Sequence, residues 1–227
     1  MLKINNAVFP STGQWLAVIR GMRHPLLSYN KSDSEEYVTN PDDIEFGLEP
    51  NYDFWLGDND KDLMTRLIKS GTEHRKFMRQ LPVIVEVTAP LYLWKEADQY
   101  RISSVTNSTS TMHKITSKEF TLDDFSHEHL DMLSLQHLSN TIEYLNKCRE
   151  NYLGEYAEIN GKKECWWQLI QLLPSSYNQT RTWSLNYEVL YNIYYQRRNH
   201  KLDEWHTFCD WIENEVPHMY EFLGEPL

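Results

Sequence analysis

The amino-acid sequence predicts a mixed fold of the α/β (α+β) class, with long helices and a small sheet. Several stretches carry apolar side chains at helical spacing, whereas only one short run is rich enough in β-branched residues for a buried strand. Hydrophobic residues make up 41% and aromatic residues 13% of the 227 residues, which is ample apolar surface for a core. The composition does not change abruptly along the chain, so we expect one compact domain over residues 1–227.

Composition and charge narrow the class of partner. The formal net charge is −11, whereas nucleic-acid binding requires a positive field that neutralises phosphates. We therefore expect no nucleic acid, although a few local arginines can hold one small anionic ligand. There is no signal peptide and no apolar run of membrane-spanning length, and Cys148, Cys165 and Cys209 form no C-x-x-C pair. These features predict a cytoplasmic protein without a membrane contact or a zinc site.

The N-terminal segment, residues 1–60, is the least regular part of the sequence. From Tyr29 to Asp60 it is polar and acidic with scattered Pro and Gly, which predicts a long irregular excursion. Just before, "RGMRHPLLSYNKSDS" combines Arg20 and Arg23 with several hydroxyl groups. This stretch is either a loop that wraps an anionic cofactor or an ordinary surface segment.

The first predicted helix covers "NDKDLMTRLIKSG". Asn59 is suited to cap its start and Gly71 to end it, and its apolar stripe consists of Leu63, Met64, Leu67 and Ile68.

A buried strand is predicted over Pro82–Thr88, because "PVIVEVT" is short and β-branched. Pro90 then suits the first turn of a helix through "LYLWKEADQY".

Helical periodicity dominates the second half of the chain. A helical region is predicted to start within Thr121–Ser126. "LSNTIEYLNKCREN" continues it with one apolar face, which consists of Leu138, Ile142, Leu145 and Cys148. "ECWWQLIQLLP" predicts a short apolar helix that ends at Pro174.

"SLNYEVLYNIYYQRRNH" is predicted to be helical throughout, followed by a last helix over roughly residues 202–213. The basic residues at its end suit the helix dipole, and its apolar face consists of Leu185, Val189, Leu190 and Ile193.

A basic cluster precedes the buried strand in "GTEHRKFMRQ". Its side chains could hold a phosphate or an aromatic ring, but the local sequence favours a solvated basic turn. The residues concerned are His74, Arg75, Lys76, Arg79 and Gln80.

The sequence lacks the usual signatures of hydrolases and kinases. "HEH" invites a metal hypothesis, but His127 and His129 would lie roughly 200° apart on a helix and could not chelate from one face. No G-x-S-x-G, Walker loop or paired-carboxylate motif is present.

The late predicted helix carries polar residues of interest. Asn186 and Asn192 are six residues apart, about 240° around a helix, so they do not share one narrow stripe. A buried Asn needs hydrogen-bond partners from the protein or from a ligand. Arg197 suits a bidentate contact with a phosphate or an imide, and the alternative is a terminal charge that the helix dipole favours.

In the stretch Gln99–Thr111, "QYRISSVTNSTST", seven residues are Ser or Thr and one, Arg101, is charged. By composition it is an exposed linker, or else a cradle built from hydroxyl and backbone N–H groups.

Taken in order, these pieces resemble the flavin-dependent thymidylate synthases (ThyX type). That family carries R-H-R-x-x-S-x-N-x-x-S-x-R after a strand and an "AP" helix start, and here Ala89 and Pro90 lead into a segment in which Arg101 and Ser104 match. The resemblance covers roughly residues 63–222. Its downstream "LP…W…N…L…N…R" pattern is matched by Leu173, Pro174, Trp183, Asn186, Leu190, Asn192 and Arg197.

The resemblance implies an α/β domain that forms a homotetramer, with FAD held between subunits. The family transfers a methylene group from methylenetetrahydrofolate to C5 of dUMP and reduces it with flavin hydride, and NADPH recharges the flavin. No protein nucleophile is required, because the enzyme positions the reactants. The implied function is therefore reductive methylation of a deoxyuridine nucleotide.

The same resemblance implies roles for individual residues. Arg197 is the implied catalytic residue, which activates the pyrimidine. Cofactor contacts are implied for Ser28, Gln80, Gln99, Tyr100, Arg101, Thr106, Asn186 and Asn192. Substrate contacts are implied for Glu96, Ser104, Asn107, Thr109, Thr111, Arg181 and Arg197.

Several motif positions depart from the family pattern, which raises a second hypothesis. Gln99 and Tyr100 replace Arg and His, and Thr106, Thr109 and Thr111 replace Asn, Ser and Arg. An Arg–phosphate contact contributes ~1.5–3 kcal/mol, so losing several weakens nucleotide binding by orders of magnitude. The alternative is a catalytically altered or inactive nucleotide- or flavin-binding protein of this fold. A purely structural helical protein is the third hypothesis.

The missing charge has candidate replacements nearby in the sequence. Arg181, His113 and Lys114 could compensate, or each could be a solvated surface charge.

Overall fold

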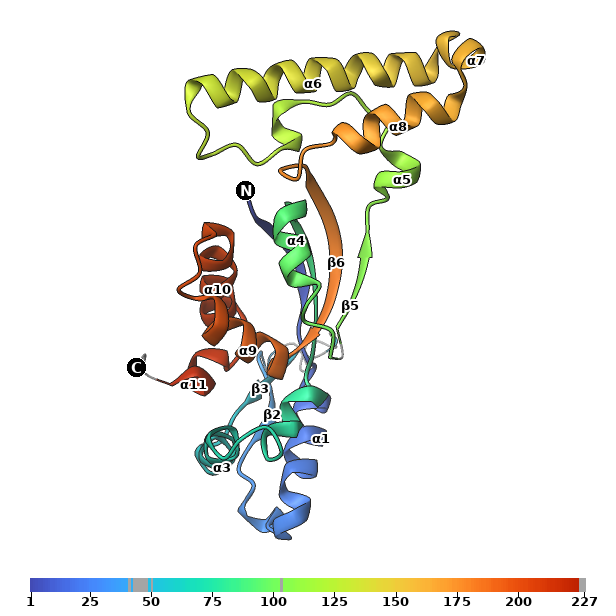
Figure 1. Ribbon diagram of the computed structural model, residues 1–227. Coiled ribbons are helices and arrows are strands. Elements are labelled where there is room, and N and C mark those ends of the chain that lie inside the picture. The colour runs from blue at the N-terminus through green and yellow to red at the C-terminus, as the bar shows by residue number, and fades with distance from the viewer. Residues whose placement is uncertain (41, 43–48, 50, 103, 225–227) are drawn as a thin grey trace. The chain divides into compact units, whose positions relative to one another are not determined.

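A computed structural model describes residues 1–40, 42, 49, 51–102 and 104–224 of the protein. This part of the chain contains both helices and strands, with several helices in succession (Figure 1), so the predicted α/β (α+β) class is confirmed. Within the described residues, a four-stranded sheet has the order β1–β4–β6–β5. Its strands are Lys3–Val8, Pro82–Pro90, Asn178–Asn186 and Val105–Ser108. Neighbours in this sheet are therefore distant in sequence.

Two compact units make up the chain. Unit 1 comprises Met1–Asn6, Glu86–Arg101 and Thr106–Trp183, and unit 2 comprises Ala7–Val85, Ile102–Val105 and Ser184–Leu227. β1, β4 and β6 contribute residues to both units. The single domain expected over residues 1–227 stays a prediction.

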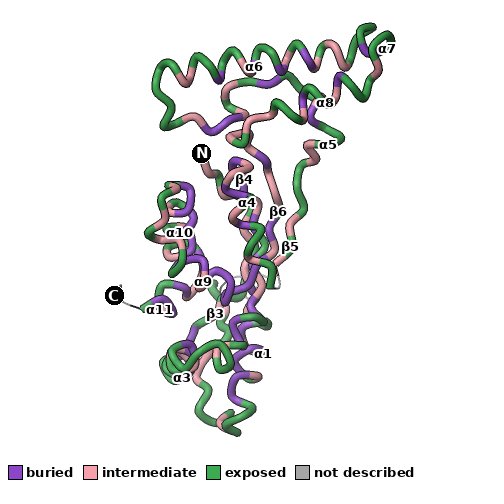
Figure 2. The backbone as a smooth tube through the Cα atoms, in the orientation of Figure 1, coloured by how far each residue is buried: buried purple, intermediate pink, exposed green. Residues whose placement is uncertain are grey.

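Unit 1 is built mainly from helices. They are α4 (Leu91–Ala97), α5 (Thr111–Lys114), η4 (Leu122–Asp124), α6 (Met132–Leu153), α7 (Tyr156–Asn160) and α8 (Lys162–Leu172). The predicted face of α6 is confirmed, because its buried residues are Leu138, Ile142, Leu145 and Cys148. In Figure 2, buried segments recur along α6 among intermediate and exposed ones. They join Phe120, Phe125 and Leu169 in one apolar cluster.

Two expectations in unit 1 need correction. Thr121–Ser126 forms only the short 3₁₀ turn η4, in which Asp124 and Thr121 bond each other's backbone N–H groups, and the long helix starts at Met132. His127 and His129 lie in the turn before that helix rather than on it, and His127 Nδ1 bonds the carbonyl of Phe125 at 2.8 Å.

Unit 2 packs its helices around aromatic side chains. The elements are α1 (Thr12–Arg23), η1 (His24–Leu26), η2 (Tyr29–Lys31), α3 (Asp58–Lys69), η3 (Arg75–Gln80), α9 (Tyr187–Arg197), α10 (Asp203–Glu215) and α11 (Met219–Leu223). Trp15 contacts the rings of Phe54, Tyr187, His218 and Phe222. Large rings bury much apolar surface, so this cluster ties α1, α9 and α11 together.

The excursion predicted over Tyr29–Asp60 is partly regular. β2 (Glu35–Val38) and β3 (Tyr52–Trp55) form an antiparallel pair in which Glu35 lies opposite Trp55. Most residues of β2 and β3 are exposed. Their sequences therefore lack the alternation of apolar and polar residues that predicts a half-buried strand. Residues 41, 43–48 and 50 of the predicted excursion lie outside the described residues.

The segment that starts at residue 184 was predicted to be helical throughout, but its first residues belong to a strand. Ser184, Leu185 and Asn186 end β6, and α9 starts at Tyr187. Leu185 therefore lies on a strand and not on the expected helical face. Because β6 carries many polar side chains, its sequence does not show the apolar pattern that predicts a strand.

The remaining predicted elements are confirmed with small shifts. α3 starts one residue before Asn59, so Gly57 and not Asn59 occupies its N-cap, and Gly71 follows its end with φ of 109°. β4 extends the predicted strand to Pro90, which becomes the N-cap of α4. Among the described residues, no helix is both long enough and apolar enough to cross a membrane.

A buried ion pair joins α1 to α3. Arg23 Nε donates to Asp60 Oδ1 at 2.5 Å, and their side chains are 3% and 0% exposed. Arg23 Nη1 donates to the carbonyl and hydroxyl oxygens of Ser28 at 3.2 and 3.3 Å. Arg23 is therefore neither a ligand-binding residue in a loop nor an exposed surface residue. For Arg23, both interpretations of the stretch "RGMRHPLLSYNKSDS" are wrong.

The carboxylate of Asp60 collects further hydrogen bonds. Its Oδ2 accepts from the hydroxyls of Ser32 and Ser34 at 2.8 Å and from the backbone N–H groups of Asp33 and Ser34 at 3.0 Å. Burial opposes ionisation, but the hydrogen bonds from Ser34, Arg23 and Ser32 outweigh it and hold the pKa of Asp60 below its ordinary value.

We predict that Asp60→Asn lowers the free energy of unfolding by about 3 kcal/mol or more at pH 7, because it leaves Arg23 buried without a counter-charge. The folded pKa of Asp60 lies below its unfolded value of about 3.9. Its contribution is therefore complete above that value and is lost as pH falls through the folded pKa. Urea unfolding at pH 7, 5 and 3 should show a smaller loss on acidification for Asp60→Asn than for the wild type.

The control is Asp62→Asn, which removes an exposed pair with Arg66. Such a pair contributes ~0.5 kcal/mol. Equal acid sensitivity of Asp60→Asn and the wild type would contradict the prediction.

Candidate ligand-binding site

The C-terminal half of the Ser/Thr-rich stretch is built into unit 1. β5 lies beside β6 at the edge of the sheet, and the backbone N–H of Thr109 donates to the carbonyl of Thr180 at 2.9 Å. Ser110 then caps α5, because its hydroxyl oxygen accepts from the backbone N–H of His113 at 3.0 Å. The stretch is therefore not a free linker, because its last residues are held by the backbone of Thr109 and the side chain of Ser110.

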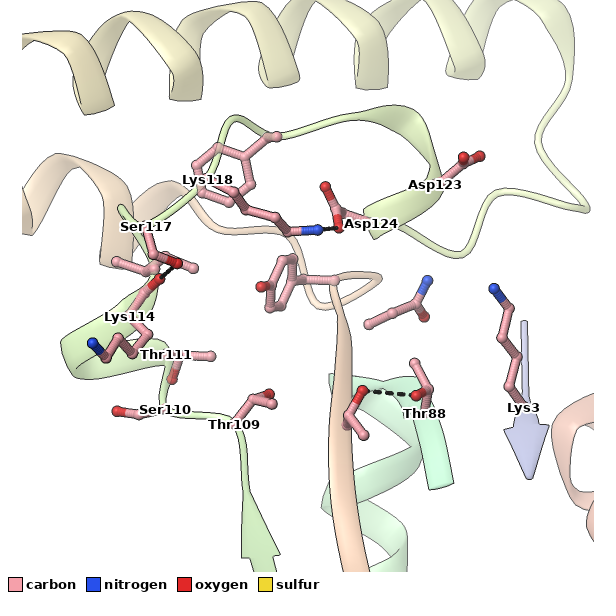
Figure 3. A pocket seen from close by; sticks show the side chains of 15 residues that line it. Lys3, Thr88, Thr109, Ser110, Thr111, Lys114, Ser117, Lys118, Asp123 and Asp124 are labelled. Carbon is pink, nitrogen blue, oxygen red and sulfur yellow. Dashed lines mark hydrogen bonds and ion pairs between the residues drawn. The ribbon is translucent and has the colours of Figure 1, made fainter. Parts of the chain in front are cut away.

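These hydroxyl groups line a cavity of about 460 Å³ in unit 1 (Figure 3). We call it the hydroxyl–lysine cavity, after its lining of Lys3, Thr109, Thr111, Lys114, Lys118 and Asn178, among others. Its volume lies within the usual range for small-molecule sites of roughly 300–1,000 Å³. Residues from β1, β5–α5, η4 and β6 meet here, so only the folded chain assembles it.

One of the three lysines is already neutralised. The ammonium group of Lys118 forms an ion pair with Asp124, which also accepts from the backbone N–H and hydroxyl of Thr121 at 2.9 and 3.1 Å. Burial opposes ionisation of Asp124, but the hydrogen bonds from Lys118 and Thr121 prevail and lower its pKa. This pair therefore brings little net charge to the cavity.

The other two lysines are free. Among the described residues, no partner contacts the ammonium group of Lys3 or Lys114, and both side chains are exposed. Asp123 also lines the cavity, and Figure 3 shows it on the opposite side from Lys114. The side formed by Thr109, Thr111 and Lys114 is therefore positive and rich in donors.

Asn178 has an unused donor in the same cavity. Its Oδ1 accepts from the hydroxyl of Ser126 at 2.8 Å, whereas its Nδ2 is buried without a hydrogen-bond partner. A buried unpaired donor costs about 1–3 kcal/mol. An acceptor brought by a ligand would remove this cost.

Arg181, which the resemblance implies as a substrate contact, has partners within unit 1. Its Nη1 donates to Asp98 Oδ1 at 2.8 Å and its Nε to Gln179 Oε1 at 2.9 Å. The guanidinium group lies 4.4 Å from the ring centre of Trp94, a cation–π geometry. The positive charge of Arg181 therefore already interacts with Asp98 and with the ring of Trp94 before a ligand binds.

Unit 2 contains a charge cluster around Glu188. Arg75 Nε donates to Glu188 Oε1 at 3.2 Å, Arg79 pairs with the same carboxylate, and Arg75 Nη2 donates to Asn192 Oδ1 at 3.1 Å. The guanidinium group of Arg75 also lies 5.0 Å from the ring centre of Tyr191. Arg75 is only 14% exposed, so the solvated basic turn favoured from the sequence is wrong for Arg75. Arg79 is 44% exposed even though it pairs with Glu188.

The three polar residues of the late helix have distinct positions. Asn186 is the N-cap of α9, where its Oδ1 accepts from the backbone N–H of Val189 at 3.0 Å. Because Asn186 precedes the helix, the separation of about 240° expected between Asn186 and Asn192 on one helix does not apply. Asn192 belongs to the Glu188 cluster. Arg197 ends α9 with its guanidinium group 5.1 Å from the ring centre of Trp205.

The structure separates the residues implied by the resemblance into two groups. In unit 1, Thr109 and Thr111 line the hydroxyl–lysine cavity, and Arg181 lies beside Asp98; the others there, Glu96, Gln99, Tyr100, Arg101, Thr106 and Asn107, do not line it. In unit 2 are Ser28, Gln80, Ser104, Asn186, Asn192 and Arg197. Ser103 of the Ser/Thr-rich stretch lies outside the described residues.

Sequence reasoning singled out Lys114 but missed the other lysines and Asn178. Lys3 and Asn178 are separated by most of the chain, and no local pattern marks either one. Only the pairing of distant strands brings them to one cavity.

We predict that Glu188→Gln lowers the free energy of unfolding by about 3 kcal/mol, because two guanidinium groups then face each other without a carboxylate. Urea unfolding at pH 7 measures this loss. Glu215→Gln, at the exposed end of α10, is the matched control. If both variants unfold at the same urea concentration, Glu188 does not hold this cluster together.

No family profile matches the chain, and no curated protein matches it by sequence. Among solved structures, 106 chains match. One is thymidylate synthase X (ThyX) from Helicobacter pylori with FAD and dUMP, which covers 99% of this chain and 98% of its own, with a TM-score of 0.64 and 16% identity. Another is flavin-dependent thymidylate synthase ThyX from the same organism, complexed with FAD and dUMP, with a TM-score of 0.60, 15% identity and coverage of 99% and 97%. The chain therefore has a ThyX-like fold.

Proposed function

We propose that this chain is a divergent FAD-dependent transferase of the thymidylate synthase type, which reductively methylates a deoxyuridine nucleotide at C5. The observation that carries the proposal is the ThyX-like fold over nearly the whole chain, shared with proteins that were solved with FAD and dUMP. The ordered match of Asn186, Asn192 and Arg197 in the sequence supports it independently of the fold.

The residues of unit 2 fit an anionic cofactor such as FAD. In the Glu188 cluster two guanidinium groups meet one carboxylate, so a surplus positive charge remains for a diphosphate. Gln80 is exposed at the end of the same 3₁₀ helix. When bound, FAD supplies the hydride that reduces the transferred carbon, and NADPH and methylenetetrahydrofolate are the further co-substrates of the proposal.

The chain's own residues act by positioning. Glu188 and Asn192 orient Arg75 toward one geometry, and Asn186 fixes the start of α9. Arg197, held against Trp205, donates to the pyrimidine ring and stabilises charge that develops there. A homotetramer in the cytoplasm, with sites between subunits, belongs to the same proposal.

A second candidate function is a nucleotide- or flavin-binding protein without the reaction. The neutral residues Gln99, Tyr100 and Thr111 at cationic motif positions favour it. So does Arg181, whose charge is committed to Asp98 and Trp94.

The absorbance spectrum and tritium release separate the two functions. The freshly purified protein should show flavin absorbance or take up added FAD, and it should release tritium from C5-labelled dUMP with NADPH and methylenetetrahydrofolate. Flavin uptake without tritium release would favour the second function. A colourless protein without FAD affinity would exclude the first function and would leave only nucleotide binding for the second.

We predict that Arg197→Ala lowers turnover by at least about 100-fold, as expected when a donor to a developing charge is removed. Arg198→Ala is the matched control, because Arg198 lies one position further along and stacks on Tyr194 and Tyr195. Tritium release measures turnover, and thermal unfolding checks that both variants are folded. Undiminished turnover in Arg197→Ala would show that its catalytic role is misassigned.

A further inference from the structure

We propose that Cys148 and Cys165 form a dithiol site in unit 1 that a peroxide oxidises to a reversible disulfide. This site is independent of the proposed function, because neither cysteine belongs to the residues proposed to contact a cofactor or a nucleotide. All three cysteines of the chain are free and buried, so neither thiol is already part of a disulfide.

The two cysteines lie on the buried faces of two packed helices. The buried residues of α8 are Cys165 and Leu169, and Cys148 belongs to the buried face of α6 together with Leu145. Leu145, Cys148 and Leu169 share one apolar cluster. These faces of α6 and α8 are therefore turned toward each other.

The direction of the two helices places the cysteines at the same level. α8 runs back along α6 after the short helix α7 (Figure 1). Leu145 lies about one helical turn before Cys148, and Leu169 lies about one helical turn after Cys165. Because both leucines belong to one cluster, the antiparallel direction brings Cys148 and Cys165 opposite each other, one turn nearer to α7.

Both thiols line a cavity of about 410 Å³, which residues of α6, α7 and α8 enclose. We call it the thiol cavity, and its other lining residues include Tyr144, Asn151, Tyr156, Glu164 and Gln168. Tyr144 and Tyr156 are each 52% exposed, so the cavity opens to solvent. Because a water molecule takes up about 30 Å³, a peroxide of similar size fits beside the two thiols.

The lining also indicates which oxidant enters and which thiol attacks it. Glu164 gives the thiol cavity a carboxylate, which repels anionic oxidants. Burial raises the pKa of the Cys148 thiol, and the charge of a neighbouring Cys165 thiolate raises it further, against a hydrogen bond with Tyr144. Cys165 lies in the first turn of α8, where the helix dipole stabilises a thiolate. Cys165 is therefore the attacking thiol, and Cys148 resolves the product.

The reaction balances with hydrogen peroxide as the oxidant. The Cys165 sulfur attacks one peroxide oxygen, the O–O bond breaks, and a sulfenic acid and one water molecule form. The Cys148 sulfur then attacks the sulfenic sulfur, so that an S–S bond replaces the S–O bond and a second water molecule leaves. The two thiols supply the two protons and the two electrons that reduce the peroxide.

The disulfide ties α6 to α8 across their short connection. A covalent link of this kind restricts the unfolded chain and thereby stabilises the folded one. The oxidised protein is therefore expected to unfold at a higher temperature than the reduced protein, and a dithiol reductant is expected to reverse the difference.

Thiol titration and mass spectrometry of the full chain test this inference. The reduced wild type, Cys148→Ser, Cys165→Ser and Cys209→Ser are treated with hydrogen peroxide and then digested without reduction. We expect the wild type to lose two of its three titratable thiols and to yield a peptide that links Cys148 to Cys165. Dithiothreitol should restore all three thiols.

Cys209→Ser is the matched control. The Cys209 thiol is also buried, but it lies on α10 in unit 2, with its Sγ 3.9 Å from the carbonyl oxygen of Tyr194. This variant should form the linked peptide and unfold at a higher temperature after oxidation, as the wild type should. Neither change is expected in Cys148→Ser or Cys165→Ser.

Three thiols that stay titratable in the peroxide-treated wild type would overturn the inference. The same holds for a linked peptide recovered only from a covalent dimer, or for sulfinic or sulfonic acid at either cysteine without the link. These readouts come from the wild type and do not depend on the folding of a serine variant. Absent flavin uptake or absent tritium release in the untreated protein would count only against the proposed function.

Discussion

A guanidinium group removed from water needs an acceptor, and this requirement governs where the chain can hold a ligand. Arg23 is committed to Asp60, Arg75 to Glu188 and Asn192, and Arg181 to Asp98. Each pairing joins elements that are distant in sequence, so the arginines stabilise the fold first. Most of their charge is neutralised before any anion arrives. Among these pairings only the Glu188 cluster, in which Arg75 and Arg79 share one carboxylate, keeps a surplus positive charge.

The same requirement explains why some elements could be predicted and others could not. The apolar face of α6 could be predicted because burial of one helix face leaves a periodic pattern in the sequence. The residues of this face pack in one apolar cluster; they are Leu138, Ile142, Leu145 and Cys148. β6 was missed because it buries Gln179 and Asn186 alongside Trp183 and Leu185. Gln179 is satisfied by a distant partner, because its Nε2 donates to the carbonyl of Thr109 at 2.8 Å. A single sequence contains no record of such distant pairing.

The residues of the candidate site also divide into those that the sequence could predict and those that it could not. The Ser/Thr-rich stretch was recognisable as a candidate cradle, and Thr109 and Thr111 do line the cavity. Lys3 and Asn178 could not be found, since β1 and β6 approach this cavity only through the sheet order β1–β4–β6–β5. Within the basic cluster before β4, Arg75 was misinterpreted for a related reason. Its acceptor, Glu188, lies more than a hundred residues further along the chain, and without it Arg75 looks solvated.

Fold likeness at 16% identity leaves the chemistry of the site to be argued from its own residues. Coulomb attraction depends on distance far more than on direction, so a positive charge can act on an anion from any element that brings it near. Hydrogen-bond geometry is less transferable, because donor, hydrogen and acceptor must align. In the hydroxyl–lysine cavity, hydroxyl residues stand at two motif positions, Thr109 and Thr111, while Lys3 and Lys114 come from β1 and α5. The hydrogen-bond donors of a motif are therefore easier to recognise in a sequence than the charges that lie near them in the fold.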